Sequence, residues 1–310
     1  MASFSSVCRL EGCKRKALLS LVCNRFKPKG EALAFGTAFH TSLEKGLDAG
    51  INELRKEYLQ DQIPLLTEMY VRQETFMAKN NIDVLAHELD FEIKLDGLDE
   101  PFRGFIDGLA LWNGEQWLLE FKTARYIDVS HVPIDSQITA YLWACRETGL
   151  AEPKGVIYIV NQKSMNKPPV VLASGHLSTA KNQGCSYQDY VDKAMEIYGE
   201  DVPPKVELFM EWLEKNEQPK LVAVPTRRTE EQLDRFGEDV RKYVKLEQEL
   251  KQLLEEKGAT KAIRETPCFP NKFCFQNCDF KDQCKAILLD DSIEFDRLDK
   301  ETFDDIFNAN

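Results

Sequence analysis

The sequence predicts an α/β fold in which helices flank a central mixed β-sheet, with a C-terminal helical region and a cysteine-rich segment added. Three observations support this prediction. Apolar residues recur at helical spacing in the N-terminal third, short alternating runs fill residues 84–122, and four cysteines lie within residues 268–284. Since 43% of the 310 residues are hydrophobic, the chain can bury a large core.

The expected elements follow in order along the chain. Helical spacing covers residues 31–59 and about 65–80, strands are expected at 91–95, 105–112, 117–121 and 155–160, and helices at 136–148, 187–198 and 230–257. Asp135 or Ser136 should cap the helix at 136–148. The polar stretch 161–183, with Pro168-Pro169 and Gly175, is expected to be a loop.

Five segments are expected from these changes in pattern. They are an N-terminal segment (1–30), a core (31–165), a helical insertion or extension (166–262), a cysteine-rich region (263–290) and an acidic tail (291–310).

The net charge of −12 argues against a protein that coats nucleic acid through a global basic field. Basic stretches occur at Lys14-Arg15-Lys16, at 25–29 and at Arg227-Arg228, and each is as well explained by a solvated face. The absence of a long apolar run and of a secretory pattern leads us to expect a cytoplasmic protein without membrane contact.

One hairpin carries a group of charged residues. Asn113-Gly114 between two apolar runs is the signal for a two-residue type I′ turn. If Trp112 pairs with Glu115, Asp107 lies directly opposite Glu120, and the two-residue period of a strand puts Lys122 on the same face.

Two facing carboxylates repel, by roughly 0.2–1 kcal/mol at an exposed site and by more when buried. A hard cation such as Mg²⁺ or Mn²⁺, which prefers oxygen ligands, would remove that repulsion. Lys122 could then orient or help deprotonate a metal-bound water. The alternative is that Asp107, Glu120 and Lys122 are only the polar face of a half-exposed hairpin.

The residues around this hairpin resemble a known family. Gly104-Phe105-Ile106-Asp107-Gly108 and Leu118-Leu119-Glu120-Phe121-Lys122-Thr123 look like the D…(D/E)-x-K core of the PD-(D/E)XK nuclease superfamily, in its RecB-like branch. Ile106 stands where the nominal motif has proline. The resemblance implies a restriction-endonuclease-like core and hydrolysis of DNA phosphodiester bonds.

Further motifs of that branch occur in family order. His40, at the end of Gly36-Thr37-Ala38-Phe39-His40, resembles its metal-binding histidine, Glu88 resembles its acidic residue before the hairpin, and Gln137-Ile138-Thr139-Ala140-Tyr141 resembles its Q-x-x-x-Y helix. The resemblance implies that His40, Asp107, Glu120 and the backbone carbonyl of Phe121 bind Mg²⁺ or Mn²⁺, with Glu88 as a further candidate. Gln137 and Tyr141, four residues apart on one helical face, would contact phosphate or order Lys122. Taken alone, His40 is as well explained as a core histidine, Glu88 as a surface residue, and Tyr141 as a rim tyrosine.

Cys268, Cys274, Cys278 and Cys284 are separated by five, three and five residues, which predicts metal binding and departs from the C-x2-C pairs of zinc ribbons. The layout resembles RecB-like nucleases with an iron–sulfur cluster, such as AddB and the CRISPR adaptation nucleases. That resemblance implies a [4Fe–4S] cluster on Cys13, Cys274, Cys278 and Cys284, with Cys268 either a spare or an alternative ligand in place of Cys13.

The remaining cysteines have weaker claims. Cys8 and Cys23 are lesser candidates for the N-terminal ligand, and Cys145 and Cys185 are expected to be ordinary residues.

The expected function is a metal-dependent DNA nuclease, specifically a phage-type exonuclease for recombination, repair or end processing in a bacterial host cytoplasm. Because the chain has no Walker loop, a separate helicase or recombination protein is an expected partner beside DNA. Two alternatives stay open. One is a catalytically inactive DNA-binding scaffold of the same fold, and the other is a zinc-stapled nuclease, in which zinc replaces the iron–sulfur cluster.

Overall fold

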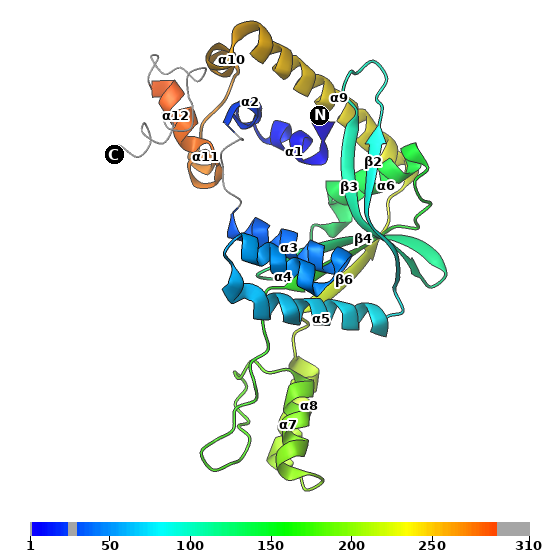
Figure 1. Ribbon diagram of the computed structural model, residues 1–310, viewed down its shortest axis with the longest axis vertical. Coiled ribbons are helices and arrows are strands. Elements are labelled where there is room, and N and C mark those ends of the chain that lie inside the picture. Colours follow the sequence, from blue (N-terminus) through cyan, green and yellow to red (C-terminus); the bar gives the residue numbers. More distant parts are fainter. Residues whose placement is uncertain (1, 24–29, 290–310) are drawn as a thin grey trace.

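A computed structural model describes residues 2–23 and 30–289 of the chain. Figure 1 shows a sheet with helices on both faces, a projecting arm and a separate helical lobe. The strands are β1 (Ala2–Ser3), β2 (Asp83–Ile93), β3 (Phe102–Trp112), β4 (Glu115–Ala124), β5 (Val156–Gln162) and β6 (Leu221–Thr226). The helices are α1 (Phe4–Gly12), α2 (Lys14–Cys23), α3 (Glu31–Lys45), α4 (Leu47–Lys56), α5 (Ile63–Lys79), α6 (Ser136–Thr148), α7 (Tyr187–Tyr198), α8 (Pro204–Asn216), α9 (Glu230–Lys257), α10 (Ala259–Glu265), α11 (Lys272–Asn277) and α12 (Lys281–Leu289).

The six strands form one mixed sheet, which confirms the expected fold class. β4 pairs with β3 antiparallel and with β5 in parallel, and β6 adds to β5 antiparallel. β2 runs along one edge of β3, while the other edge is shared: β1 pairs at Phe102 and Arg103, and β4 pairs from Gly108 to Trp112. β3 therefore changes its neighbour between Arg103 and Gly108, and Asp107 lies at that change.

Two apolar layers hold the helices on the sheet. On one face, α6 and α9 bury Trp143 and Val240 against strand residues such as Phe102, and the Trp143 and Phe102 rings lie 5.7 Å apart between centroids. On the other, α3 to α5 bury Phe35 and Met69 against the same strands. A sheet covered on both faces needs mostly apolar strands, and β5 is buried along nearly its whole length.

Several elements correct the expectations. The helical pattern at 31–59 forms two helices, because Gly46 (φ +91°) ends α3 and only glycine adopts such a conformation readily. Segment 166–262, expected to be helical, also contains β6, because Leu221–Thr226 pairs antiparallel with the free edge of β5. α8 was not anticipated. The helices at 136–148, 187–198 and 230–257 are confirmed to the residue, and stretch 163–186 is irregular apart from one isolated bridge.

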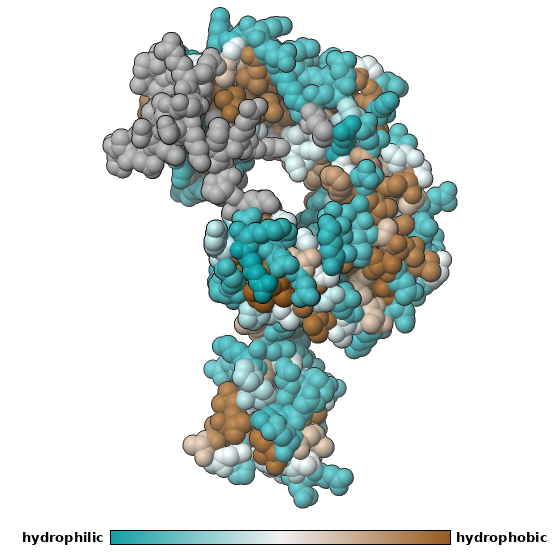
Figure 2. Space-filling model, viewed as in Figure 1, coloured by the Kyte–Doolittle hydropathy of each residue, from teal (hydrophilic) through white to brown (hydrophobic). Residues whose placement is uncertain are grey.

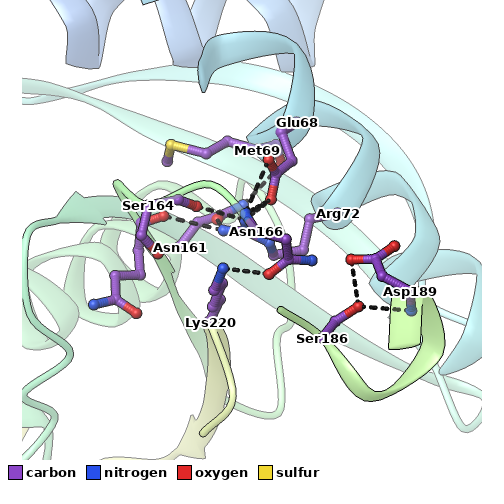
Figure 3. Close-up of polar contacts among 10 residues, drawn as sticks. Glu68, Met69, Arg72, Asn161, Ser164, Asn166, Ser186, Asp189 and Lys220 are labelled. Atoms are coloured by element: carbon purple, nitrogen blue, oxygen red, sulfur yellow. Dashed lines mark hydrogen bonds and ion pairs between the residues drawn. The ribbon is translucent and has the colours of Figure 1, made fainter. Parts of the chain in front are cut away.

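Residues 163–220 form the arm between β5 and β6, with its own small core that includes Tyr190 and Phe209. Figure 3 shows its base. Arg72 of α5 donates to Asn161 Oδ1 at 2.8 Å and to the carbonyl of Ser164 at 2.8 Å, and it pairs with Glu68. Glu68 also accepts from the backbone N–H of Asn166, to which Lys220 is bonded in turn. The arm is thus fixed to α5 where it leaves the sheet.

The lobe joins α1 and α2 to α9, α10 and α12 around Leu18, Leu250, Ile263 and Ile287. Figure 2 shows apolar surface where these helices meet. Within residues 2–23 and 30–289, none of the helices combines the length and apolar composition that a membrane crossing needs. The basic stretch 25–29 and the acidic tail 291–310 lie outside the described residues.

Candidate active site

The Asn113-Gly114 turn sets the geometry of the hairpin. Both residues have positive φ, +53° and +78°, as a type I′ turn requires. The predicted register is confirmed from Trp112–Glu115 as far as Gly108–Leu119. The paired ladder stops there, because the Asp107 carboxylate, in place of a backbone carbonyl, accepts the N–H of Phe121 at 2.8 Å.

A distortion in β2 and β3 accompanies this change. Ala86 and Leu89 pack against the same apolar layer although they are three residues apart, and so do Ile106 and Leu109 across from them. In a regular strand, residues three apart face opposite sides of the sheet. The alternation of side chains between the two faces is therefore interrupted in both strands here. Glu88 marks the point with φ +46°, an unfavourable value for a long side chain. This shift occurs at the level of Asp107.

Asp107, His40 and Glu120 come together from three elements. His40, on α3, places Nδ1 3.4 Å from Asp107 Oδ1. Burial works against ionisation of Asp107, but the bond from His40, its charge and the N–H of Phe121 hold the pKa of Asp107 below its usual value. Burial also works against protonation of His40, yet Asp107 and Glu120 raise the pKa of His40.

Glu120 is the most constrained charge in the site. Its side chain is 1% exposed, and neither carboxylate oxygen accepts a hydrogen bond of acceptable geometry from the described residues. Burial and the charge of Asp107 raise the pKa of Glu120 to about 8, although its ion pair with Lys122 acts in the opposite direction. A buried carboxylate with unused lone pairs is unfavourable unless a cation approaches.

A chain of polar groups holds Lys122. Its Nζ donates to Gln137 Oε1 at 2.9 Å, and Gln137 Nε2 donates to the Tyr141 hydroxyl at 2.6 Å. Burial disfavours the charged form of Lys122, but Glu120 and Asp107 raise the pKa of Lys122. Tyr141 is 5% exposed, and burial together with Glu120 and Asp107 raises its pKa. Gln137 and Tyr141 thus lie in one hydrogen-bonded chain with Lys122.

The start of α6 is fixed by its expected cap and by an arginine that the motifs did not indicate. Asp135 caps the helix by accepting the N–H groups of Gln137 and Ile138, as expected. Arg228, expected on a solvated face, instead donates to the carbonyls of Val132 and Asp135 at 3.0 Å each and to Thr139 Oγ1 at 2.8 Å.

Tyr158 of β5 is another neighbour of Lys122, in addition to Glu120 and Gln137, and the motifs did not indicate it. It lies beside Glu120 in the parallel ladder and is bonded to His131 at 3.1 Å. No local signal in the sequence could have placed Tyr158 or Arg228, since both depend on pairing between distant segments.

The side chains of the hairpin site pair with one another instead of converging on one point. Among the described residues, no set of three or more His, Cys, Asp or Glu side chains is arranged around one point. His40, Asp107 and Glu120 are close, but His40 is paired with Asp107, and Glu120 with Lys122. A cation would have to replace these contacts. Glu88 is exposed on β2, near Lys45, and makes no hydrogen bond or ion pair with His40, Asp107 or Glu120 in the described part of the chain.

The cysteines gather in the lobe. Cys268 contacts Cys284 and lies within electrostatic range of Cys13 and Arg15, and burial raises the pKa of the Cys268 thiol to about 11. Cys278 and Cys284 pack against the lobe core, whereas Cys274 Sγ lies 3.8 Å from Asn271 Oδ1.

The other cysteines differ in their surroundings. Cys145 and Cys185 are buried in the cores of the main body and the arm, and Cys8 is exposed. The side chain of Cys23 is outside the described set.

The sequence model of the PD-(D/E)XK nuclease superfamily matches residues 1–285. The chain belongs to this superfamily. As a PD-(D/E)XK protein it is expected to be a nuclease, and its hairpin carries Asp107 and the run Glu120-Phe121-Lys122, with Ile106 in the place of the proline in the superfamily's name. Among solved structures, the crystal structure of SSO0001 is similar at 12% sequence identity and a TM-score of 0.27, covering 73% of this chain and 82% of that chain. A search of curated proteins returned no match.

Proposed function

We propose that this PD-(D/E)XK protein is an Mg²⁺- or Mn²⁺-dependent DNA exonuclease that acts in recombination, repair or end processing. The observation that carries the proposal is Glu120. This carboxylate is buried beside Asp107 and is paired with Lys122, which a bond to Gln137 holds in place. Among the described residues, neither Glu120 oxygen has a hydrogen bond of regular geometry.

The donors present fit a hard divalent cation. Carboxylate oxygens of Asp107 and Glu120, the carbonyl of Phe121 and the imidazole of His40 are groups that Mg²⁺ and Mn²⁺ accept, with Glu88 as a further candidate on the neighbouring strand. Such an ion would supply the positive charge that stabilises a cleaved phosphate and lowers the pKa of a nucleophilic water.

Lys122 is suited to orient the attacking water. With its pKa raised by Glu120 and Asp107, Nζ keeps its proton and can donate a hydrogen bond. Gln137 restricts this ammonium group to one position, and Tyr141 restricts Gln137. Together they form a positioning chain from α6 into the site. This chain restricts the conformations of Lys122 before the reaction, so that less conformational entropy is lost in the transition state.

DNA is the proposed substrate, with a helicase or recombination protein as the proposed partner. The chain carries a net charge of −12, so DNA binding must rely on local positive charge. Binding should therefore weaken steeply as salt is added, and a flat salt dependence would contradict a DNA substrate.

We further propose a structural [4Fe–4S] cluster on Cys13, Cys278, Cys284 and either Cys274 or Cys268. Cys268 lies with Cys284 and Cys13, which supports it as the fourth ligand. Purification without oxygen, followed by visible spectra of Cys268→Ser and Cys274→Ser, tests the choice, because zinc thiolates are colourless and loss of a true ligand removes the absorbance. A colourless, zinc-loaded wild type would indicate the zinc-stapled alternative.

The function is tested with linear DNA labelled at the 5′ or the 3′ end and with covalently closed circles. We expect metal-dependent shortening of linear DNA, intact circles, and loss of cleavage in Lys122→Ala. Lys154→Ala, which removes an exposed lysine near the hairpin turn, is the matched control. Cut circles would indicate an endonuclease, and no cleavage by folded wild type would indicate a DNA-binding scaffold.

A further inference from the structure

Arg15 is a buried cation in the lobe. Its side chain, on α2, is 5% exposed, although the surrounding Lys14-Arg15-Lys16 run suggested a solvated face. Nε and Nη2 donate to the carbonyl of Thr266 at 3.2 and 2.9 Å, and Nη2 also approaches the carbonyl of Arg264 at 3.4 Å. These bonds connect the N-terminal and C-terminal parts of the lobe.

Part of the guanidinium has no partner. Nη1 is buried without a hydrogen-bond acceptor among the described residues, and no carboxylate of those residues lies within ion-pair distance of Arg15. A guanidinium stays protonated in proteins, so its charge cannot be removed by burial. Backbone carbonyls alone offset the charge only in part, and an unpaired buried charge is strongly unfavourable.

The groups beside this cation are cysteines. Cys268 contacts Cys284 and lies within electrostatic range of Arg15 and Cys13. It follows Thr266, whose carbonyl Arg15 binds, by two residues. A neutral thiol is a weak acceptor, whereas a thiolate is anionic and accepts charge-assisted hydrogen bonds. The free Nη1 and the cysteines therefore match each other only when the sulfurs are deprotonated, which is their state when they bind a metal.

A second source of positive charge lies beside Cys13. Cys13 precedes α2, and the N–H of Lys16 points to Cys13 Sγ at 3.5 Å. A helix N-terminus carries partial positive charge. Two separate sources of positive charge, the start of α2 and Arg15, thus face the same group of sulfurs.

We propose that Arg15 is the charge partner of a metal–thiolate centre formed by this cysteine group. Its role is positional and electrostatic: Nη1 donates to ligand sulfur, and the guanidinium compensates the negative charge of the centre while Nε and Nη2 hold Thr266 and α10 in place. The inference rests on the cofactor proposed above and is independent of the hairpin chemistry.

The test compares Arg15→Met with Arg15→Lys in the full-length protein purified without oxygen. Lys14→Met is the matched control, because it removes one positive charge from an exposed position of the same helix. The first readout is the rate at which the bound metal passes to a chelator. Loss of a residue that supports metal ligands typically weakens a site by about 10- to 100-fold, so we expect release from Arg15→Met to be faster by about that factor.

The second readout is the midpoint potential of the centre. Removal of a buried positive charge disfavours the more negative, reduced state, so the potential of Arg15→Met should fall. Arg15→Lys should be intermediate, since it keeps the charge and loses the planar fork. Lys14→Met should match wild type in both measurements.

Three results would overturn the inference. One is a folded wild type that contains neither iron nor zinc. The second is an Arg15→Met protein that keeps the wild-type release rate. The third is equal destabilisation of Arg15→Met with and without metal, which would show that Arg15 only ties α2 to the Thr266 carbonyl. DNA cleavage measured in the same samples separates this outcome from failure of the nuclease assignment, which depends on Lys122.

Discussion

The hairpin and the lobe each contain a buried charge without a full partner, and the two charges have opposite signs. In the hairpin, the Glu120 carboxylate faces Asp107 and needs a cation. In the lobe, the Arg15 guanidinium faces cysteines and needs anionic sulfur. The negative charge of Glu120 favours binding of a hard metal ion through oxygen. The positive charge of Arg15 favours a metal centre bound through anionic sulfur.

The comparison also shows two ways of building a site. The hairpin site is assembled by neighbours in sequence and completed by α3 and α6, whose approach follows from packing on the sheet. The lobe joins residues about 250 positions apart, as in the bond from Arg15 to Thr266. We therefore expect the hairpin to govern the reaction and the lobe to govern the stability of the joined termini.

The largest expected effect separates these roles. Lys122→Ala should reduce DNA cleavage by between about 100-fold and 10,000-fold, the range found for groups that assist proton transfer or orientation. The metal content of the lobe should stay unchanged, because Lys122 makes no contact there. Parallel measurement of cleavage rate and bound iron or zinc checks this, and loss of both together would contradict separate roles.

The reverse change should affect the lobe. Cys284→Ser should remove the visible absorbance and lower the free energy of unfolding by about 2–4 kcal/mol, by analogy with other crosslinks that close long loops. Mn²⁺ binding at the hairpin should persist in the fraction that stays folded. Urea unfolding and Mn²⁺ titration test this, with buried Cys145→Ser as the comparison for a cysteine outside the lobe.

Glu120→Gln should stabilise the metal-free protein. The folded-state pKa of Glu120, about 8, lies above its ordinary value of 4.5, so the folded protein resists ionisation of this group. The stability of metal-free wild type should therefore fall as pH rises from about 5 to 8, by on the order of 1–3 kcal/mol. Glu120→Gln should show a flatter profile in urea unfolding, and parallel profiles would argue that Glu120 is not a strained carboxylate.

The smallest effect concerns the helix that orients Lys122. Asp135→Ala removes the cap of α6 and should cost about 1 kcal/mol of stability. Because α6 carries Gln137, cleavage should also slow, whereas Ser186→Ala, which removes the equivalent cap of α7 in the arm, should cost similar stability without changing cleavage. Thermal unfolding and single-turnover rates distinguish the two, and equal rates would contradict the positioning chain.

Local signals explain what could be predicted. Asn113-Gly114 determined the turn and hence the register, and the cap of α6 and the charged faces of α7 and α9 indicated these three helices. The family motifs indicated His40, Glu120 and Lys122 without their contacts.

The features that escaped prediction depend on long-range packing or on backbone strain. Several features arise only when distant segments meet: the positive φ of Glu88, the neighbour change in β3, the pairing of β6, the burial of Arg15 and the bonds of Arg228. Charge patterning described Arg15 as solvated because it carries no information about which surface becomes covered.

Binding of Mn²⁺ to the full-length protein, measured with DNA cleavage in the same samples, tests the central claim most directly. The variants are Asp107→Asn and Glu120→Gln, with Glu196→Gln on the arm as a control carboxylate. We predict that both site variants lose Mn²⁺ binding and cleavage together while the control keeps both. Wild-type binding or wild-type cleavage in either site variant would contradict the hairpin as the metal-dependent active site.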